Sequence, residues 1–360
     1  MDRTVLVGVA EIADVFGVSR QAASNWRERY TDFPKPAASL KSGPVWELPD
    51  ILTWADERDM QVKTAKAEAL ESGGTTESTC GVVAMVNMKG GVGKSTLTAN
   101  IGWFCAYRAN LRVLMVDLDP QFNLSQYVLG NDRYEKHLKK QKPTIVDIFE
   151  QHTLGNAENG ILGKEAITVA QEWNDGSLIH VIPSSLDLAW ALKNPHGKEH
   201  LVRDYIQDVK DDYDLILIDC PPTESMLTTA AYMASDYLLI PVRPEYFSTI
   251  GLPLLVRSLG DYKKTHKTEP VPKLAGIVFN DSDHSKTEHK RSRKTVRKAA
   301  KEQGWHIFKS QLSHSDSYPA GARVGKPIFL TDYARSWKKE ELRAVAKEFM
   351  DRVGLSKRGD

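Results

Sequence analysis

Apolar residues in the later part of the chain gather in short runs that are typical of buried strands. The runs extend over Gly81 to Val86, Val113 to Val116, Leu178 to Ile182, Leu215 to Ile218, Tyr237 to Ile240 and Leu274 to Phe279. Helical patterns separate most of these runs. Because strands that alternate with helices form a parallel sheet covered on both faces, the pattern predicts a doubly wound, mostly parallel α/β fold.

The first 60 residues follow a different pattern, with two short amphipathic helices in succession. The first helix is indicated by apolar residues at the spacing of one helix face: Val9, Ile12, Ala13 and Phe16. A turn follows, and Ser19 can cap a second helix that runs to about Tyr30. A hairpin over Leu40 to Trp46 and a helix starting at Pro49 complete a predicted winged helix-turn-helix.

A polar segment separates the two patterns. Residues 61–79 begin as an Ala/Glu/Lys helix and end in a Gly/Ser/Thr-rich run with nothing to bury. We therefore expect a helix-turn-helix domain at residues 1–60, a linker at 61–79 and a large α/β domain at 80–356. A chain of 360 residues is long enough for these two domains.

Bulk composition limits the possible partners and locations. The 48 Lys+Arg and 47 Asp+Glu residues nearly cancel, so any contact with nucleic acid must come from local clusters of charge. Cys80, Cys105 and Cys220 are too few and too widely spaced for a disulfide scaffold. No apolar run approaches the ~18 residues of a membrane span, and the first residues do not form a signal peptide. We expect a soluble, cytoplasmic protein.

The most specific motif is a glycine-rich loop between the first predicted strand and a helix over Leu97 to Tyr107. Glycines allow backbone amides to point at phosphate oxygens, and the helix N-terminus adds its positive end. Lys94 supplies a mobile cation, and the Ser95 hydroxyl can bind Mg²⁺. The expected nucleotide-binding residues are Lys89, Gly90, Gly91, Val92, Gly93, Lys94, Ser95 and Thr96.

Carboxylates follow two of the predicted strands. Alternation along the strand turns Asp117 and Asp119 to the same face, and Asp219 directly ends another apolar run. All three are expected at the carboxyl edge of the sheet, where open α/β sheets bind phosphate. A lone Asp at a strand end is more often a cap or turn residue, but three of them after a phosphate loop indicate magnesium and water handling.

The glycine loop departs from the common P-loop. Met88 stands where that loop has its first glycine, and Lys89 opens the loop instead. Further segments follow in the order Val116 to Gln121, Asp219 to Pro222, Pro241 to Leu252 and Gly325 to Ile328. In order and spacing these motifs resemble the ParA partition ATPases, which carry a deviant Walker-A loop. The resemblance extends over roughly Gly81 to the C-terminus.

The resemblance implies roles for the site residues, with ATP and Mg²⁺ as cofactors. Lys89 reaches the phosphates of the partner subunit's nucleotide, and Asp119 positions the attacking water. Asp117 supports the metal, Asp219 holds it through water, and Asn280 lies near adenine. Phosphoryl transfer depends mainly on positioning and charge neutralisation, so this set is sufficient.

The resemblance also implies what the protein does. Such an ATPase forms a homodimer on ATP·Mg, binds DNA in that state and is released by hydrolysis, in plasmid or chromosome partition. Its expected partners are DNA and a ParB-like centromere-binding protein. We expect it to be nucleoid-associated in the cytoplasm.

The second helix of the N-terminal module carries residue types that read bases in the major groove. Ala22, Ala23 and Trp26 are expected to face the core, which leaves Arg20, Gln21, Ser24, Asn25 and Arg27 for DNA. The module resembles the excisionase-like and MerR-like winged helices, so it predicts specific operator binding. The alternative is a helix pair that only packs against another element.

A second candidate DNA surface is the basic run from Lys286 to Lys301. Phosphate attraction by such a run is independent of DNA sequence. The ParA resemblance favours this role over the alternative of a solvated charged face. The candidates are Lys290, Arg291, Arg293, Lys294, Arg297 and Lys298.

Three other functions compete with partition. A membrane-positioning ATPase like MinD ends in a basic amphipathic helix, but acidic residues oppose the apolar stripe of the last helix here, which favours core packing and no membrane partner. An electron carrier like nitrogenase reductase needs cluster-ligating cysteines that this chain does not place suitably. The third is a nucleotide-switched transcriptional regulator in which ATP turnover is incidental.

Overall fold

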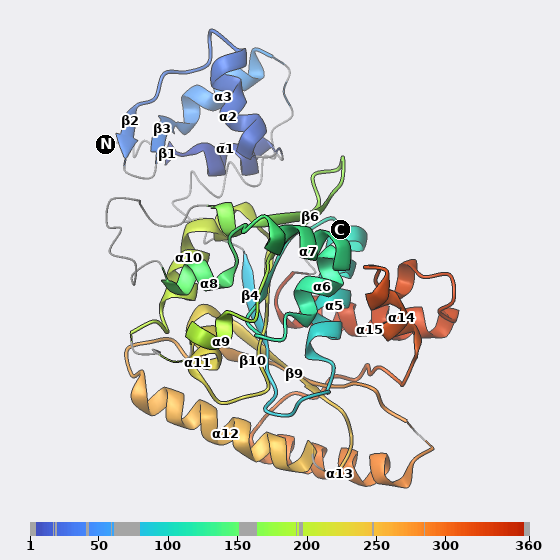
Figure 1. Cartoon of the computed structure of the whole chain (residues 1–360). Coiled ribbons are helices and arrows are strands. Elements are labelled where there is room, and N and C mark those ends of the chain that lie inside the picture. The colour runs from blue at the N-terminus through green and yellow to red at the C-terminus, as the bar shows by residue number, and fades with distance from the viewer. Residues whose placement is uncertain are drawn as a thin grey trace. The chain divides into compact units, whose positions relative to one another are not determined.

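The structure is a computed structural model that describes residues 5–355 apart from 17, 19, 41–42, 59, 61–79, 151–163, 192, 194–196, 247 and 284. The chain divides into two compact units, Met1–Thr79 and Cys80–Asp360 (Figure 1). The expected linker at 61–79 and the turn residues Gly17 and Ser19 lie outside the described residues.

The N-terminal unit packs helices against a small antiparallel sheet in the order β1-β3-β2. The predicted helices and hairpin are present as α1 (Val9–Phe16), α2 (Arg20–Arg29), α3 (Leu48–Asp56), β2 (Ala38–Leu40) and β3 (Gly43–Glu47). The short strand β1 (Leu6–Val7), which the sequence pattern did not predict, pairs with β3.

Aromatic rings fill the core of this unit. The Trp26 ring lies 5.2 Å from that of Phe16 and 5.6 Å from that of Trp54, between ring centroids. Phe33 packs edge-on against both Trp46 and Trp54. Large rings bury much apolar area per residue, which allows a small unit to form a core of its own.

The second unit is built on a sheet that has seven strands within the described residues, in the order β10-β9-β4-β8-β5-β7-β6. The predicted runs are its parallel strands: β4 (Gly81–Met85), β5 (Arg112–Asp117), β7 (Leu178–Ile182), β8 (Leu215–Asp219), β9 (Tyr237–Val242) and β10 (Lys273–Phe279). The strand β6 (Thr168–Glu172) was not predicted, and it pairs antiparallel with β7 at the sheet edge.

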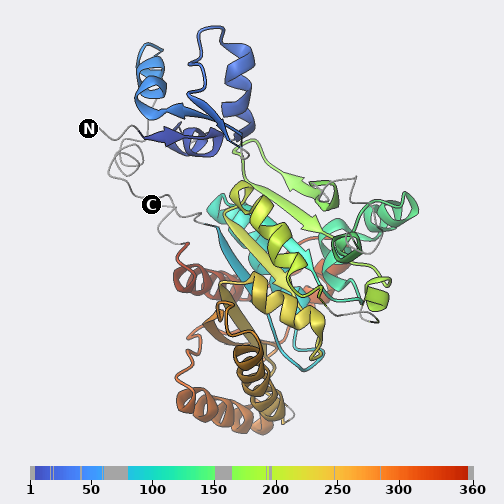
Figure 2. The same ribbon diagram turned by 90° about the vertical axis from the view of Figure 1, so that its left-hand side faces the viewer.

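Helices cover both faces of this sheet (Figure 2). One face is covered by α5 (Lys94–Ala109), α6 (Asn123–Leu129), α7 (Asn131–Lys139), α14 (Ser317–Arg323) and α15 (Ser336–Arg352). The other is covered by α8 (Ile145–Glu150), α9 (Leu188–Ala191), α10 (Leu201–Val209), α11 (Met226–Ala234), α12 (Ser248–Thr265) and α13 (Thr287–Glu302).

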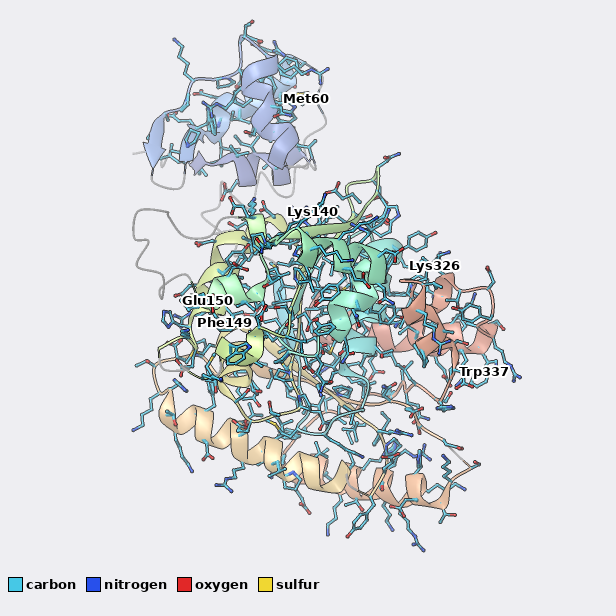
Figure 3. All side chains as sticks on the ribbon, viewed as in Figure 1. Met60, Lys140, Phe149, Glu150, Lys326 and Trp337 are labelled. Carbon is cyan, nitrogen blue, oxygen red and sulfur yellow. The ribbon has the colours of Figure 1, made fainter. Side chains whose placement is uncertain are left out.

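Neighbouring residues on the central strand enter different cores, as the alternation of a strand requires. Val82 and Ala84 pack under α8, α10 and α11, whereas Val83 and Met85 pack under α5 and α15. Phe149 of α8 points into the first of these cores and is fully buried (Figure 3). The predicted doubly wound architecture is therefore confirmed.

The C-terminal helix α15 packs in the core, as the sequence predicted. Its stripe of Leu342, Val345, Ala346 and Phe349 is 0% exposed. Within the described residues, no helix has the length and apolar character needed to cross a membrane.

Candidate nucleotide site

The glycine loop connects the carboxyl end of β4 to the first turn of α5. Gly91 and Gly93 have φ angles of +71° and +86°, a left-handed conformation that glycine adopts without the strain of a Cβ. Gly93 is the N-cap of α5, so the free amides of that helix begin inside the loop. The loop therefore has the backbone shape of an anion cradle.

Two asparagines fix the loop to neighbouring strands. Asn280, at the end of β10, donates from Nδ2 to the Val92 carbonyl at 2.8 Å, and a Cβ on Gly93 would lie 2.2 Å from that nitrogen. Asn87 donates to the Pro241 carbonyl at 2.8 Å and accepts from the Lys89 amide at 2.9 Å. Asn280 thus supports the loop backbone, and its contact with adenine stays a prediction.

The two lysines of the loop have different surroundings. Lys94 is 6% exposed, and its Nζ donates to the carbonyls of Asn87 and Lys89 at 3.2 and 3.3 Å. Burial lowers the pKa of Lys94, and Asp219 is the main charge that opposes this shift. Lys89 is more exposed, and its Nζ lies 2.8 Å from Glu245 Oε2. Lys94 is thus inside the cradle, and Lys89 is at its mouth.

Two carboxylates lie next to each other at the ends of adjacent strands. Asp117 and Asp219 are register partners in the β5–β8 pair, and both are fully buried. Among the described residues, neither oxygen of Asp219 accepts a hydrogen bond of good geometry, although the Ser95 hydroxyl lies beside the carboxyl group. Burial, and then the charge of Asp117, raise the pKa of Asp219 well above its usual range. The Ser95 hydroxyl and the charge of Lys94 oppose this shift but do not outweigh it, so further positive charge at the carboxyl group would be stabilising.

Asp117 differs from Asp219 because its carboxylate is engaged by hydrogen bonds. It accepts from the amide and the hydroxyl of Ser125 at 2.8 and 2.6 Å, and from the Asp119 amide at 3.1 Å. Burial raises the pKa of Asp117 to about 7, although these hydrogen bonds oppose the shift. Asp117 therefore fixes the start of α6 and the turn that carries Asp119. The Asp119 carboxylate is 6% exposed and accepts from the Gln121 amide at 2.9 Å.

The residues at this edge fit Mg²⁺. The described residues contain no group of three or more His, Cys, Asp or Glu side chains that could hold a metal ion by themselves. Mg²⁺ does not need such a group, because it is usually bound by one or two carboxylates together with phosphates and water. The unpartnered oxygens of Asp219, with the Ser95 hydroxyl beside them, provide the protein side of that set.

The basic run forms α13, which packs against α12 (Figure 1). Lys290, Arg291, Lys294, Arg297 and Lys298 are exposed, as a DNA surface requires. Arg293 differs from this expectation: it is partly buried, and its Nη1 donates to Ser282 Oγ at 2.7 Å. Burial also lowers the pKa of Arg293, so its role is to fix the helix rather than to face solvent. Exposed Lys301 was missed, although it lies on the same helix face.

In the N-terminal unit, the candidate DNA-binding residues of α2 differ in how exposed they are. Asn25 and Arg27 are exposed, and Ser24 is partly buried. The Arg27 guanidinium lies over the Trp46 ring, 5.6 Å from its centroid. Ala23 and Trp26 are buried as predicted, while the side chains of Arg20, Gln21 and Ala22 lie outside the described residues.

Sequence reasoning did not identify three supporting residues. Asn87 holds the glycine loop, Ser125 holds the Asp117 carboxylate, and Glu245 pairs with Lys89. The partner of Lys89 is 156 residues away in the sequence, so only the fold brings the pair together. The hydroxyl of Ser125 left a weaker signal, since it follows the two aspartates at the start of the next helix.

The chain is similar to proteins that are already known. Residues 80–270 match a family model described as an AAA domain. The chromosome-partitioning ATPase Soj of Treponema pallidum is 30% identical over 273 residues, which cover 74% of this chain and 97% of that protein.

Solved structures share the fold. An ATP complex of McdA from Cyanothece has a TM-score of 0.62 at 18% identity and covers 77% of this chain and 97% of that one. A plasmid partition protein of Borrelia burgdorferi bound to AMPPNP has a TM-score of 0.58 at 21% identity, with coverages of 76% and 99%. With the family match and the relatives, these findings show that the chain belongs to the ParA/MinD family of P-loop ATPases.

Proposed function

We propose that this protein is a DNA-partition ATPase that dimerises around two ATP·Mg units, binds DNA in that state and is released by hydrolysis. The observation that carries the proposal is the pair of lysines on one glycine cradle. Lys94 is buried within the cradle, whereas Lys89 lies at the mouth in an ion pair with Glu245. A lysine at the mouth can leave its partner and reach a phosphate held by a second subunit, as the deviant Walker-A resemblance implies.

Each residue at the edge has a proposed task in hydrolysis. The loop amides and Lys94 bind the phosphates, and Asp219 with Ser95 holds the metal. Bound Mg²⁺ supplies charge neutralisation at the transferred phosphoryl group. Asp119 orients the attacking water, and Asp117 keeps the Asp119 turn in place through the amide hydrogen bond of 3.1 Å.

Non-specific DNA binding is assigned to one face of α13. Lys290, Lys294, Arg297 and Lys301 follow the spacing i, i+4, i+7 and i+11, which places them on one stripe about 16 Å long. We call these residues the α13 stripe. The whole chain has a formal net charge of only +1, so this local cluster of positive charge is what would attract phosphate.

The N-terminal unit is proposed to bind a specific operator and so to autoregulate or target the protein. Its α2 presents Asn25 and Arg27 beside the β2–β3 hairpin, the arrangement expected of a winged helix-turn-helix. A ParB-like protein is the proposed partner of the ATPase unit, and association with the nucleoid follows from the DNA binding.

One variant separates partition from nucleotide-switched transcription. Asp119→Ala is expected to lower ATP turnover by about 100-fold or more, the usual loss when a positioned acid–base group is removed. ATP-dependent dimerisation, measured by light scattering, is expected to survive. Asp132→Ala, on the exposed first turn of α7, is the matched control and should keep full turnover.

The DNA measurements complete the test. The proposal predicts that random-sequence DNA is bound more tightly with ATP than with ADP, and that Asp119→Ala stays on DNA longer after ATP addition because it does not hydrolyse. Operator binding that responds to nucleotide but is indifferent to Asp119→Ala, with no measurable turnover in the wild type, would instead support the transcriptional regulator.

A further inference from the structure

Four charged side chains of alternating sign lead away from the nucleotide loop. Lys89 Nζ lies 2.8 Å from Glu245 Oε2, and Arg243 Nε lies 2.9 Å from Glu245 Oε1 and 2.8 Å from Asp281 Oδ2. These side chains come from the glycine loop, the segment after β9 and the segment after β10. We call them the ion-pair chain. Their side chains are 24–35% exposed, so water and salt screen them less than fully exposed pairs.

The last member belongs to a short segment, residues 280–283, that contacts both the glycine loop and α13. Asn280 donates to Val92 of the loop at 2.8 Å. Ser282 Oγ accepts from Arg293 of α13 at 2.7 Å, and the Asp283 amide donates to Nδ1 of His289, also in α13, at 2.9 Å. Consecutive residues of one segment therefore join the nucleotide loop to the helix that carries the α13 stripe.

The backbone of this segment depends on such contacts. Asp281 has a φ angle of +51°, the left-handed conformation that is uncommon outside glycine. Surrounding contacts must hold a residue in that conformation, and the ion pair with Arg243 is one of them. Asp281 Oδ1 also lies 2.6 Å from Nδ1 of His314. A change in the Arg243 contact therefore bears directly on the shape of the segment.

Lys89 links this chain to the nucleotide. The hydrogen bond from Lys89 lowers the pKa of Glu245 against the effect of burial, and the charge of Arg243 lowers it further, so both cations favour the ionised carboxylate. When Lys89 moves to a phosphate, Arg243 is the ion-pair partner that Glu245 keeps among the described residues. Arg243 is shared between two carboxylates, so a stronger attraction to Glu245 weakens its hold on Asp281.

We propose that Glu245, Arg243 and Asp281 are positioning residues that couple occupancy of the nucleotide site to the placement of α13. The proposal rests on the proposed function, and it names the path by which nucleotide changes DNA affinity. Couplings of this kind between two sites amount to about 5- to 150-fold in affinity. Because coupling is reciprocal, DNA must tighten ATP binding by the same factor as ATP tightens DNA binding.

The test uses the full chain with Asp281→Asn, which removes the charge but keeps a residue type that tolerates left-handed φ. Two quantities are measured in parallel with random-sequence duplex DNA and a fluorescent ATP analogue with Mg²⁺. The first is the ratio of the DNA affinity with ATP to the DNA affinity with ADP. The second is the factor by which DNA increases the affinity of the protein for the ATP analogue. In Asp281→Asn both are expected to fall towards one, while the analogue still binds saturably. Wild-type values in the variant would overturn the proposal.

Two control variants separate the coupling from general damage. Glu269→Gln breaks the Arg203–Glu269 ion pair, which is buried to a similar degree, and should leave the ratio unchanged. His314→Gln removes the contact at the second carboxylate oxygen of Asp281, which does not lead to Lys89, and should also leave the ratio unchanged because the Arg243 ion pair still holds Asp281. A fall of the ratio in either control to the level of Asp281→Asn would overturn the assignment to the ion-pair chain.

A double variant tests whether the members act as one path. Glu245→Gln and Asp281→Asn together should reduce the ratio no further than either alone, because members of one coupled set are non-additive. Additive losses would contradict a single path. If the wild type itself showed no difference between ATP and ADP, the proposed function would fail, whereas a wild-type difference that persists in Asp281→Asn refutes only the coupling.

Discussion

Substitution of the glycine that caps α5 tests the geometry of the nucleotide loop. Gly93→Ala places a Cβ at a residue with φ of +86°, and that Cβ would lie 2.2 Å from Asn280 Nδ2. The left-handed conformation costs a non-glycine residue about 1–2 kcal/mol. The Asn280 side chain must also move, which removes its hydrogen bond to Val92 at a cost of about 1 kcal/mol. We therefore expect Gly93→Ala to lower the free energy of unfolding by about 2–3 kcal/mol.

Gly91→Ala is the matched control in the same loop. Gly91 also has positive φ, of +71°, but a Cβ there would meet no atom within 4 Å. Gly91→Ala is therefore expected to lower the free energy of unfolding only by the cost of the left-handed backbone, about 1–2 kcal/mol. Urea unfolding of the nucleotide-free chain, followed by circular dichroism, measures both variants.

The Asn280→Ala background isolates the side-chain contact. In that background Gly93→Ala should cost about 1 kcal/mol less than in the wild type, because the hydrogen bond is already absent. Equal losses for Gly91→Ala and Gly93→Ala, with no difference in the Asn280→Ala background, would refute the assignment of Asn280 as the support of this loop.

Three other substitutions test separate parts of the account. Asp219→Asn should abolish the dependence of ADP affinity on Mg²⁺, measured by calorimetry, because it removes the carboxylate charge assigned to the metal. Retained Mg²⁺ dependence would exclude Asp219 as a metal-holding residue. Burial lowers the pKa of His137 from its usual 6.5, so the unfolded chain takes up this proton first and His137 destabilises the fold as pH drops below 6.5. The raised pKa values of Asp117 and Asp219 act in the opposite direction over the same range, so the test is a difference between two proteins. On acidification the free energy of unfolding of His137→Gln should rise relative to that of the wild type, and an identical pH dependence would contradict the shift. Lys294→Gln in the α13 stripe should reduce the salt dependence of DNA binding by about one phosphate contact. Arg293→Gln should mainly lower Tm, because Arg293 donates a hydrogen bond to Ser282. The reverse pattern would contradict the roles assigned to these two residues.

Much of the α/β fold was predictable from local pattern. The predicted parallel strands are largely apolar runs, because parallel strands covered on both faces bury most of their side chains. The edge strand β6 was missed because it is only partly buried and Val169 is 45% exposed. The short β1 has too few residues to show any period.

The candidate site was predictable only in part. Glycines and aspartates at strand ends indicated the carboxyl edge, and the structure brings Lys94, Asp119 and Asp219 together there. The ion pair of Lys89 with Glu245 joins segments 156 residues apart, so no local pattern could indicate it. Arg293 lies in a basic run like its neighbours, and only the packing of Ser282 against α13 shows that it points inward.

Calorimetric titration of the nucleotide-free full chain with ATP and Mg²⁺ tests the central claim most directly. The account predicts saturable binding at one nucleotide per chain, strongly reduced in Lys94→Ala, because the buried Lys94 ammonium is the cation inside the cradle. No binding to the wild type, or equal binding to wild type and Lys94→Ala, would contradict it.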